Sequence, residues 1–298
     1  MKNYSKHTLL NIALLISALF PAVTLAQDTT QTASAGVKKE TVRATFENSV
    51  VLNNQTVEIT PKKSLDFMIQ HRFGLIESND DLFGFYAPAN IRMGLTYGIT
   101  KCLAVGVGVT KNKMIYDLNL SASILKQTKQ KGIPVSIAYF GNIGRSALKE
   151  ENFYNQENEY KASNRLTYFN EIMIARKFNS HLSLQVAFTY SHMNLVDSIY
   201  QQHDFYGVSF VGKYKFSPQS SVLIDFDYLV NVSGIDESVR PKPNVTLGYE
   251  VSTGSHQFQV FAGTGANILG QEYRVYNTND IADLEVLFGF NITRLWGF

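Results

Sequence analysis

Charged side chains recur at alternate positions within apolar stretches of this 298-residue sequence, a spacing that can build a passage lined with charge. The set with this spacing comprises Asp66, Arg72, Arg92, Asp117, Glu171, Lys213, Lys215, Asp225, Asp227 and Glu285. Opposite charges that line a pore can orient a small polar or zwitterionic solute. The same residues can instead pair with one another and fill a closed interior, because the inside of a membrane barrel is polar in either case.

Four of these residues form the most distinct cluster. Asp225 and Asp227 lie in one predicted strand, and Lys213 and Lys215 lie in the strand before it. Neighbouring strands lie about 4.8 Å apart, so the two pairs are expected to interact. The spacing therefore predicts a mixed cluster that sets the ion preference of an open lumen.

Strands are the elements that must position these charges. In each apolar stretch, hydrophobic residues occupy every second position and polar residues the positions between, which is the period of a β-strand. The predicted strands begin near Leu65, Ile91, Leu103, Tyr116, Ile133, Leu166, Leu182, Tyr206, Val222, Val245, Phe258 and Leu284. The alternate glycines of VGVGV (105–109) share one strand face, where they leave room in the lumen and do not cradle a phosphate.

The lengths of the connections distinguish a membrane barrel from a soluble sandwich. Long connections are predicted near 77–88, 144–163, 195–204, 231–243 and 270–281, and short ones near 100–102, 178–181, 217–220 and 252–256. Long and short connections mostly alternate, as they do in outer-membrane barrels, although 110–113 and 126–132 depart from the rule. We therefore expect the long connections outside the cell and the short ones in the periplasm.

Aromatic residues of the apolar face gather at the ends of the predicted strands. Tyr116, Tyr139, Tyr168, Tyr190, Tyr206 and Tyr228 are expected at the outer ends, and Tyr97, Tyr214, Tyr249, Trp296 and Phe298 at the inner ends. Two aromatic belts around an aliphatic band match the two interfaces of a bilayer. Since strand edges in hydrocarbon must all be paired, the sequence predicts an all-β, antiparallel up-and-down transmembrane β-barrel of about 12 strands.

The N-terminal residues predict export. Lys2 and Lys6 precede an apolar run from Leu9 to Leu19, and small residues at 24 and 26 offer a cleavage site. This pattern is typical of a signal peptide, here residues 1–26, and an uncleaved membrane anchor is the alternative. The expected location is the bacterial outer membrane.

Two further segments complete the predicted organisation. Residues 27–63 are expected to form a periplasmic leader or a plug, and residues 64–298 the barrel. The final strand carries an apolar face that ends on Phe298. An aromatic residue at this place resembles the signal that the barrel-assembly machinery reads, so that machinery and outer-membrane lipid are the expected partners.

Composition and spacing argue against several other classes of function. A net charge of +2 gives no footprint for nucleic acid. The single cysteine, Cys102, excludes an internal disulfide.

His71 and His192 could ligate a metal or haem, but neither has a partner two residues away, and an interfacial position is the favoured interpretation. Acidic residues at 150, 151, 157 and 159 could bind calcium, but a solvated loop is the favoured interpretation. No metal and no cofactor is expected.

A lipid-surface hydrolase is the enzymatic alternative. Ser191, His192 and Asn194 supply the residue types of a serine hydrolase within a short stretch. In a strand, however, Ser191 and His192 point to opposite faces, and a nucleophile must lie within hydrogen-bond reach of its base. The sequence therefore favours a protein that is not an enzyme.

Several stretches resemble a Bacteroidetes-type outer-membrane β-barrel family of unknown function. They are LDFMIQHRFG (65–74), ANIRMGLTYGIT (89–100), MIYDLNL (114–120), IARKFNSHLSLQV (174–186) and GFNITRLWGF (289–298). The resemblance covers nearly the whole chain after the predicted signal peptide and implies the fold and location, but no catalytic residues. The sequence as a whole predicts a porin-like channel or solute transporter, with a structural or partner-binding barrel of blocked lumen as the alternative.

Overall fold

The computed structural model describes residues 40–76, 82–129, 132–155, 157, 159–196, 202–232 and 234–298. The predicted signal peptide lies outside these residues. Among the described residues, no helix has the length and apolar character that a membrane-crossing helix requires.

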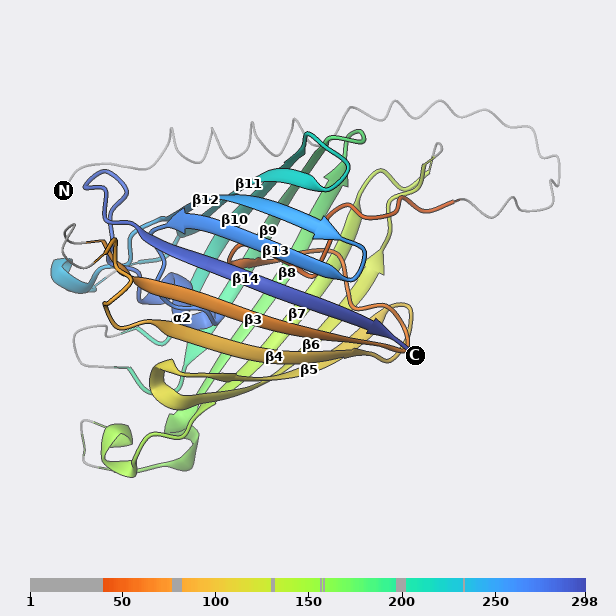
Figure 1. Cartoon of the computed structure of the whole chain (residues 1–298). Coiled ribbons are helices and arrows are strands. Elements are labelled where there is room, and N and C mark those ends of the chain that lie inside the picture. Colours follow the sequence, from red (N-terminus) through yellow and green to blue (C-terminus); the bar gives the residue numbers. More distant parts are fainter. Residues whose placement is uncertain are drawn as a thin grey trace, which may run out of the picture. The chain divides into compact units, whose positions relative to one another are not determined.

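Twelve antiparallel strands of the described chain close into a barrel (Figure 1). They are β3 (Ser64–Leu75), β4 (Asn90–Gly98), β5 (Leu103–Thr110), β6 (Ile115–Leu125), β7 (Ser136–Ser146), β8 (Leu166–Lys177), β9 (Leu182–Met193), β10 (Asp204–Lys215), β11 (Ser220–Leu229), β12 (Asn244–Thr253), β13 (His256–Gly263) and β14 (Leu287–Gly297). Each strand pairs with its neighbours in sequence, and β14 pairs with β3 to close the ring. The predicted fold class and strand number are confirmed.

The remaining elements are short. β1 (Val50–Val51) and β2 (Asn54–Gln55) form a hairpin with a two-residue turn. Single turns of 3₁₀ helix are η2 (Asn112–Met114), η3 (Glu150–Phe153), η4 (Ala162–Arg165) and η5 (Glu237–Val239), and α2 (Gly270–Val275) is an α-helix. We call the end of the barrel with the connections 147–165, 230–243 and 264–286 the long-loop end, and the end with 178–181, 216–219 and 254–255 the short-turn end.

Burial alternates along the strands as the sequence predicts. On β11, Ile224 and Phe226 are exposed on the outside of the ring, whereas Asp225 and Asp227 are buried inside it. The tyrosines at the strand ends form belts on the outer surface, with Tyr116 and Tyr228 at the long-loop end and Tyr214 at the short-turn end. This arrangement suits a surrounding bilayer, because aromatic rings favour its interfaces.

Three details of the predicted strands are wrong. β7 begins at Ser136 and not near Ile133, so Tyr139 lies at the short-turn end and not at the outer end. β13 ends at Gly263, which leaves Ile268 buried in the following connection. β14 begins at Leu287, because Leu284 has a φ of 58° and cannot continue an extended strand. Apolar spacing alone does not show where the ladder of hydrogen bonds ends.

A described stretch before β3, residues 45–58, lies inside the barrel. It enters and leaves at the short-turn end, where Thr41 bridges Thr128 and Lys62 bridges Gly98. Between these points the β1–β2 hairpin makes the turn, as Figure 1 shows in orange. We call residues 45–58 the inner segment, because they contact the inward side chains of the barrel wall.

An apolar core lies within the lumen. Phe46, Val51, Leu52 and Val57 of the inner segment are buried in one cluster with inward side chains of the wall. The wall contributes Ala138, Phe140, Phe169, Met173, Ala175, Ala187, Val211, Leu223 and Phe261. At Gly248 a Cβ would lie 2.5 Å from Leu52 Cδ2, so the missing side chain of this glycine makes room for the Leu52 side chain. The inner face of the wall therefore matches the inner segment in shape and in the positions of its apolar side chains.

We expect Ile224→Arg to destabilise the folded barrel by about 2–4 kcal/mol, because it places a charge on the lipid face near mid-bilayer. Val230→Arg, on the same face just beyond β11, is the matched control and should cost about 0–1 kcal/mol. Denaturant titration after refolding into lipid vesicles measures both values. Equal costs would contradict the assignment of this face to lipid.

Candidate functional site

The predicted lumen charges occupy inward strand positions, with one exception. Asp66, Arg72, Asp117, Glu171, Lys213, Asp225 and Asp227 are buried, and Arg92 and Lys215 are partly buried at inward positions. Glu285 instead lies in the connection before β14, where its Oε2 accepts a hydrogen bond from the backbone N–H of Asp280. Glu285 therefore belongs to the long-loop end and does not line the lumen.

The two lysines of β10 pair with glutamates that the sequence reading did not place in the cluster. The Lys213 Nζ lies 2.8 Å from Glu250 Oε1 and 3.3 Å from Glu47 Oε1, and the Lys215 Nζ lies 2.7 Å from Glu47 Oε1. Glu250 occupies the polar face of a predicted strand, so alternation could have found it. Glu47 lies in the inner segment, where no periodicity marks it.

The predicted contact between these lysines and the aspartates of β11 is wrong. In the observed register Lys213 lies opposite Leu223, and Asp225 lies opposite Val211. The aspartates are thus displaced toward the long-loop end, away from the lysines. Their partners come from the two segments that enter the lumen, because these segments bring donors closer than the neighbouring strand does.

The inner segment supplies donors to both aspartates. The Asn53 backbone N–H and Nδ2 donate to Asp225 Oδ2 at 3.1 and 3.2 Å. The Asn54 Nδ2 donates to Asp227 Oδ2 at 3.0 Å. Hydrogen bonds to charged groups are worth more than those between neutral groups, so this contact anchors the tip of the hairpin.

Arg72 holds the opposite side of the same asparagine. Its Nε and Nη2 donate to Asn53 Oδ1 at 3.1 and 2.8 Å, and its Nη1 donates to Asn291 Oδ1 at 3.0 Å. The guanidinium lies 4.5 Å from the centroid of the Phe261 ring. Asn53 is therefore fixed between a cation of β3 and a carboxylate of β11.

A second segment enters the lumen from the long-loop end. The connection between β13 and β14 turns inward and carries α2, whose residues Gln271 to Val275 are buried. The Arg274 Nη2 lies 2.8 Å from Asp227 Oδ1 and 3.9 Å from Glu171 Oε1, and it also donates to Asn54 Oδ1. The inner segment and α2 thus meet at Asp227.

The remaining predicted charges form a separate contact on the wall. The Arg92 Nη2 and Nε donate to the two carboxylate oxygens of Asp117 at 2.7 and 2.9 Å. At Gly108 a Cβ would lie 2.4 Å from the Arg92 guanidinium and 2.5 Å from Asp117 Oδ1, so the glycine leaves room on the inner face, and the pair occupies that room. Asp66 is buried nearby, and its Oδ1 has no hydrogen-bond partner among the described residues.

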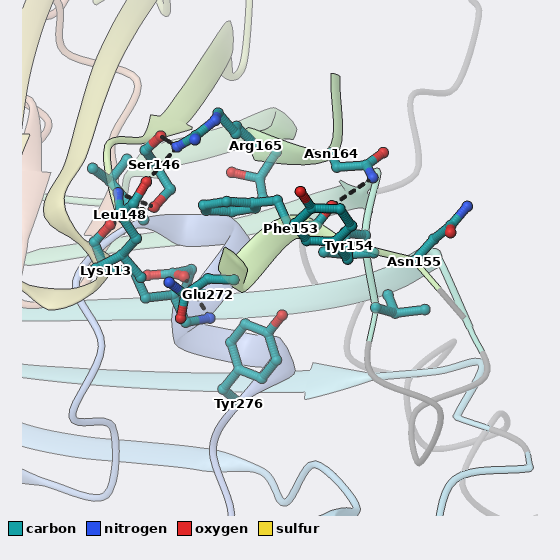
Figure 2. A pocket seen from close by; sticks show the side chains of 15 residues that line it. Lys113, Ser146, Leu148, Phe153, Tyr154, Asn155, Asn164, Arg165, Glu272 and Tyr276 are labelled. Carbon is teal, nitrogen blue, oxygen red and sulfur yellow. Dashed lines mark hydrogen bonds and ion pairs between the residues drawn. The ribbon is translucent and has the colours of Figure 1, made fainter. Parts of the chain in front are cut away.

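A pocket of 490 Å³ opens at the long-loop end (Figure 2). We call it the mouth pocket. It is lined by Lys113, Ile115, Ser146, Leu148, Asn152, Phe153, Tyr154, Asn155, Asn164, Arg165, Thr167, Leu195, Val196, Glu272 and Tyr276. Since Glu272 lies on α2 and Tyr276 follows it directly, the segment that meets the inner segment also lines this pocket.

Charges in the mouth pocket are held by internal partners. The Lys113 Nζ lies 2.9 Å from Glu272 Oε1 and 3.8 Å from the centroid of the Tyr276 ring. Burial by itself would lower the pKa of Lys113, but the attraction of Glu272 and Tyr276 outweighs burial and raises it. Arg165 donates from Nε to the Tyr160 hydroxyl at 2.8 Å and from Nη1 to the Ser146 carbonyl at 3.3 Å. No motif of the sequence marks this pocket, because its residues come from four separate connections and strand ends.

The geometry around His192 does not support a hydrolase. Ser191 is buried inside the barrel, and its Oγ has no hydrogen-bond partner among the described residues. His192 lies on the other face, with Nδ1 2.7 Å from Asp204 Oδ1 and Nε2 2.9 Å from Asn194 Oδ1. Both ring nitrogens are thus occupied, which leaves neither for a serine nucleophile.

The other candidate ligand residues are also accommodated as structural groups. The ring of His71 stacks on Phe290 with centroids 5.0 Å apart. Glu150 and Glu151 are exposed on η3, and Glu159 pairs with Lys161. Within the described part of the chain, no three histidine, cysteine or acidic side chains are grouped so that they could hold a metal ion.

Comparison with known proteins identifies a family and a fold. The family model described as "Membrane bound beta barrel domain (DUF5777)" matches residues 46–296. A solved channel, the COG4313 outer membrane channel from Pseudomonas putida F1, is 10% identical with a TM-score of 0.50, over 80% of this chain and 98% of that chain. The KdgM porin is also 10% identical, with a TM-score of 0.44, over 79% of this chain and 99% of that chain. No curated protein matches the sequence.

Double-mutant cycles test the pairing inside the lumen. Lys213→Met and Glu250→Gln should show a coupling energy of about 0.5–3 kcal/mol, because the two groups are in contact. Lys213→Met and Asp225→Asn should be nearly additive, because Asp225 is held by Asn53. Denaturant titration in lipid gives both values. A larger coupling for the second pair would restore the mixed cluster that the sequence predicts.

Proposed function

This chain belongs to the family of membrane-bound β-barrel domains, and from that premise we propose that it is a porin-like outer-membrane channel whose lumen the inner segment closes. The observation that carries the proposal is the match between the inner segment and the barrel wall. Apolar side chains of the segment meet apolar inward side chains, and its asparagines meet buried charges. Of the two roles that the sequence allows for residues 27–63, these contacts support the plug.

The apolar part of the inner wall is central to this argument. Phe140, Phe169 and Phe261 point inward and are buried. In a permanently water-filled lumen such rings would be exposed to water at a cost of roughly 25 cal/mol per Å² of apolar surface. In the occupied lumen they are covered, because they lie in one cluster with the inner segment and Phe169 also packs against Gly270 and Arg274 of α2. The wall is thus complementary to an occupied lumen.

In the closed state the inner segment and α2 meet at Asp227, and we call this contact the junction. Arg274 of α2 contacts Asp227 of the wall and Asn54 of the inner segment. Because the inner segment enters from the short-turn end and α2 from the long-loop end, the junction blocks the passage from both sides. Release of either segment would expose the charges on the wall to water and open a path between the ends.

An open lumen would present a wall of mixed charge. Asp225, Asp227 and Glu171 would face Arg72 and Arg274 across the passage. Charged side chains in a constriction select solutes by sign and orientation, so a small polar solute is the substrate class that we propose. This arrangement needs no covalent chemistry, and we propose a transport role without catalysis.

We also propose how the barrel is oriented in the membrane and which partners surround it. The long-loop end faces the outside and the short-turn end the periplasm, as in other outer-membrane barrels. Outer-membrane lipid surrounds the exposed aliphatic band, which includes Ile224 and Val260. The barrel-assembly machinery recognises the outward rings of β14 and the exposed ring of Phe298. A Bacteroidetes-type origin stays a prediction of the sequence.

One observation favours a second candidate function. The junction of Arg274, Asp227 and Asn54 occupies the lumen and pairs Asp227 with a cation and an amide, as a purely structural or partner-binding barrel would require. Such a barrel would keep the inner segment in place permanently. The two functions differ in whether loosening the inner segment permits ion flow.

Single-channel recording in planar bilayers tests the channel. Asn53→Ala combined with Asn54→Ala removes hydrogen bonds to buried charged groups, each worth about 1.5–3 kcal/mol. We expect open events to become more frequent or longer in this variant than in the unaltered protein, because the inner segment is released more often.

Gln219→Ala is the matched control, since Gln219 lies in the short turn between β10 and β11 and contacts neither segment. It should record like the unaltered protein. Folding of each variant is checked by heat-modifiable mobility on gels. A folded Asn53→Ala/Asn54→Ala barrel that never conducts would reject the gated channel and favour the structural barrel.

A further inference from the structure

The mouth pocket has the size and place of a solute site. Its 490 Å³ fall within the range of about 300–1,000 Å³ that is usual for small-molecule pockets. It opens at the long-loop end, and α2 contributes Glu272 to its lining. A solute that arrives from this end would meet the pocket before it reached the junction at Asp227.

The lining combines aromatic faces with uncharged polar groups. Phe153, Tyr154 and Tyr276 contribute rings, and Asn152, Asn155 and Asn164 contribute amides. Figure 2 labels Phe153, Tyr154, Asn155, Asn164 and Tyr276, which lie on connections at the long-loop end and line the same pocket. Asn152 and Asn164 donate from Nδ2 to the carbonyls of Lys149 and Phe153, and Asn155 Oδ1 accepts from the backbone N–H groups of Glu157 and Glu159. The other atom of each amide, Asn152 Oδ1, Asn164 Oδ1 and Asn155 Nδ2, is the one that would pair with the polar edge of a ligand. Rings pack against the apolar faces of a ligand, and a sugar offers both kinds of surface.

The cationic side chains of the pocket, Lys113 and Arg165, already contact other groups of the protein. Lys113 is neutralised by Glu272, and Arg165 lies 4.5 Å from the Phe153 ring centroid while its Nη1 donates to the Ser146 carbonyl. A free ion would have to compete with these contacts. The lining therefore favours a solute that is recognised through hydroxyl groups.

Glu272 adds a hydrogen-bond acceptor at the base of the pocket. Its side chain is almost fully buried, Oε1 is bound by Lys113, and Oε2 has no hydrogen-bond partner in the part of the chain that the structure describes. A buried carboxylate oxygen without a donor carries a desolvation cost. A ligand hydroxyl that reaches this oxygen through a small side-chain rearrangement, with Lys113 still bound to Oε1, would remove that cost.

We propose that the mouth pocket binds a short neutral oligosaccharide, with Tyr154 packing against a sugar ring and Glu272 accepting a hydroxyl hydrogen bond. The inference rests on the proposed function, because it names the solute class that enters the channel. It can be tested separately, since binding is measured without any ion flow.

Isothermal titration calorimetry of the full chain, refolded in detergent, provides the test. The probes are three neutral trisaccharides (maltotriose, cellotriose and raffinose), anionic trigalacturonate and cationic spermidine. At least one neutral trisaccharide should bind. Tyr154→Ala should weaken its binding about tenfold, because it removes an exposed aromatic face, and Tyr154→Phe should restore binding because the ring returns. Glu272→Gln should weaken binding about tenfold as well, because a charged acceptor is replaced by a neutral one.

Phe83→Ala is the matched control, because Phe83 presents an exposed ring on a different connection of the same end. It should leave the affinity unchanged. Absence of binding by every neutral trisaccharide, binding of trigalacturonate or spermidine alone, or equal affinity of Tyr154→Ala and the unaltered protein would each overturn the proposal. Conductance without sugar binding would reject this site and leave the channel standing, whereas sugar binding without conductance in any variant would reject the channel alone.

Discussion

A strand in hydrocarbon must pair both of its edges, and the rest of this structure depends on that constraint. β14 pairs with β3 and β9 with β10, so the ring has no free edge. Closure sorts every strand into an outward and an inward face. Because the outward face lies against lipid, most of the polar strand residues lie in one interior, and the hydrogen bonds that they need decide what else the chain must supply.

That interior cannot be satisfied by the wall alone. Arg92 pairs with Asp117 within the wall, but Asp225 and Asp227 depend on donors from outside the ring of strands. Asn53 lies between Arg72 and Asp225, and it bonds to both at once. Because a buried charge without a partner costs several kcal/mol, the inner segment and the lumen wall stabilise each other.

The two segments that fill the lumen arrive from opposite ends and meet at a single carboxylate. This geometry joins the mouth pocket to the inner segment through a helix of one and a half turns, since Glu272 faces the pocket and Arg274 faces Asn54. Contacts made at the long-loop end and contacts made by the inner segment therefore share one short element. A channel that opens by release of the inner segment would be sensitive to what α2 touches at the mouth.

The sequence by itself determined the fold class, the strand number and which face of each strand is lipid-facing, because a period of two is a local property that neighbouring residues carry together. Of the charges that the sequence assigns to the lumen, Glu285 lies outside the strands, in the connection before β14. The apolar residues at inward positions, such as Phe140 and Leu223, depart from the alternation, and only the structure shows that they lie in one buried cluster with the inner segment. The partners of the charges were decided only by the tertiary structure. Lys213 meets Glu47 and Glu250 rather than Asp225, because strand register and the path of two inserted segments bring together residues that are far apart in the chain and share no periodicity.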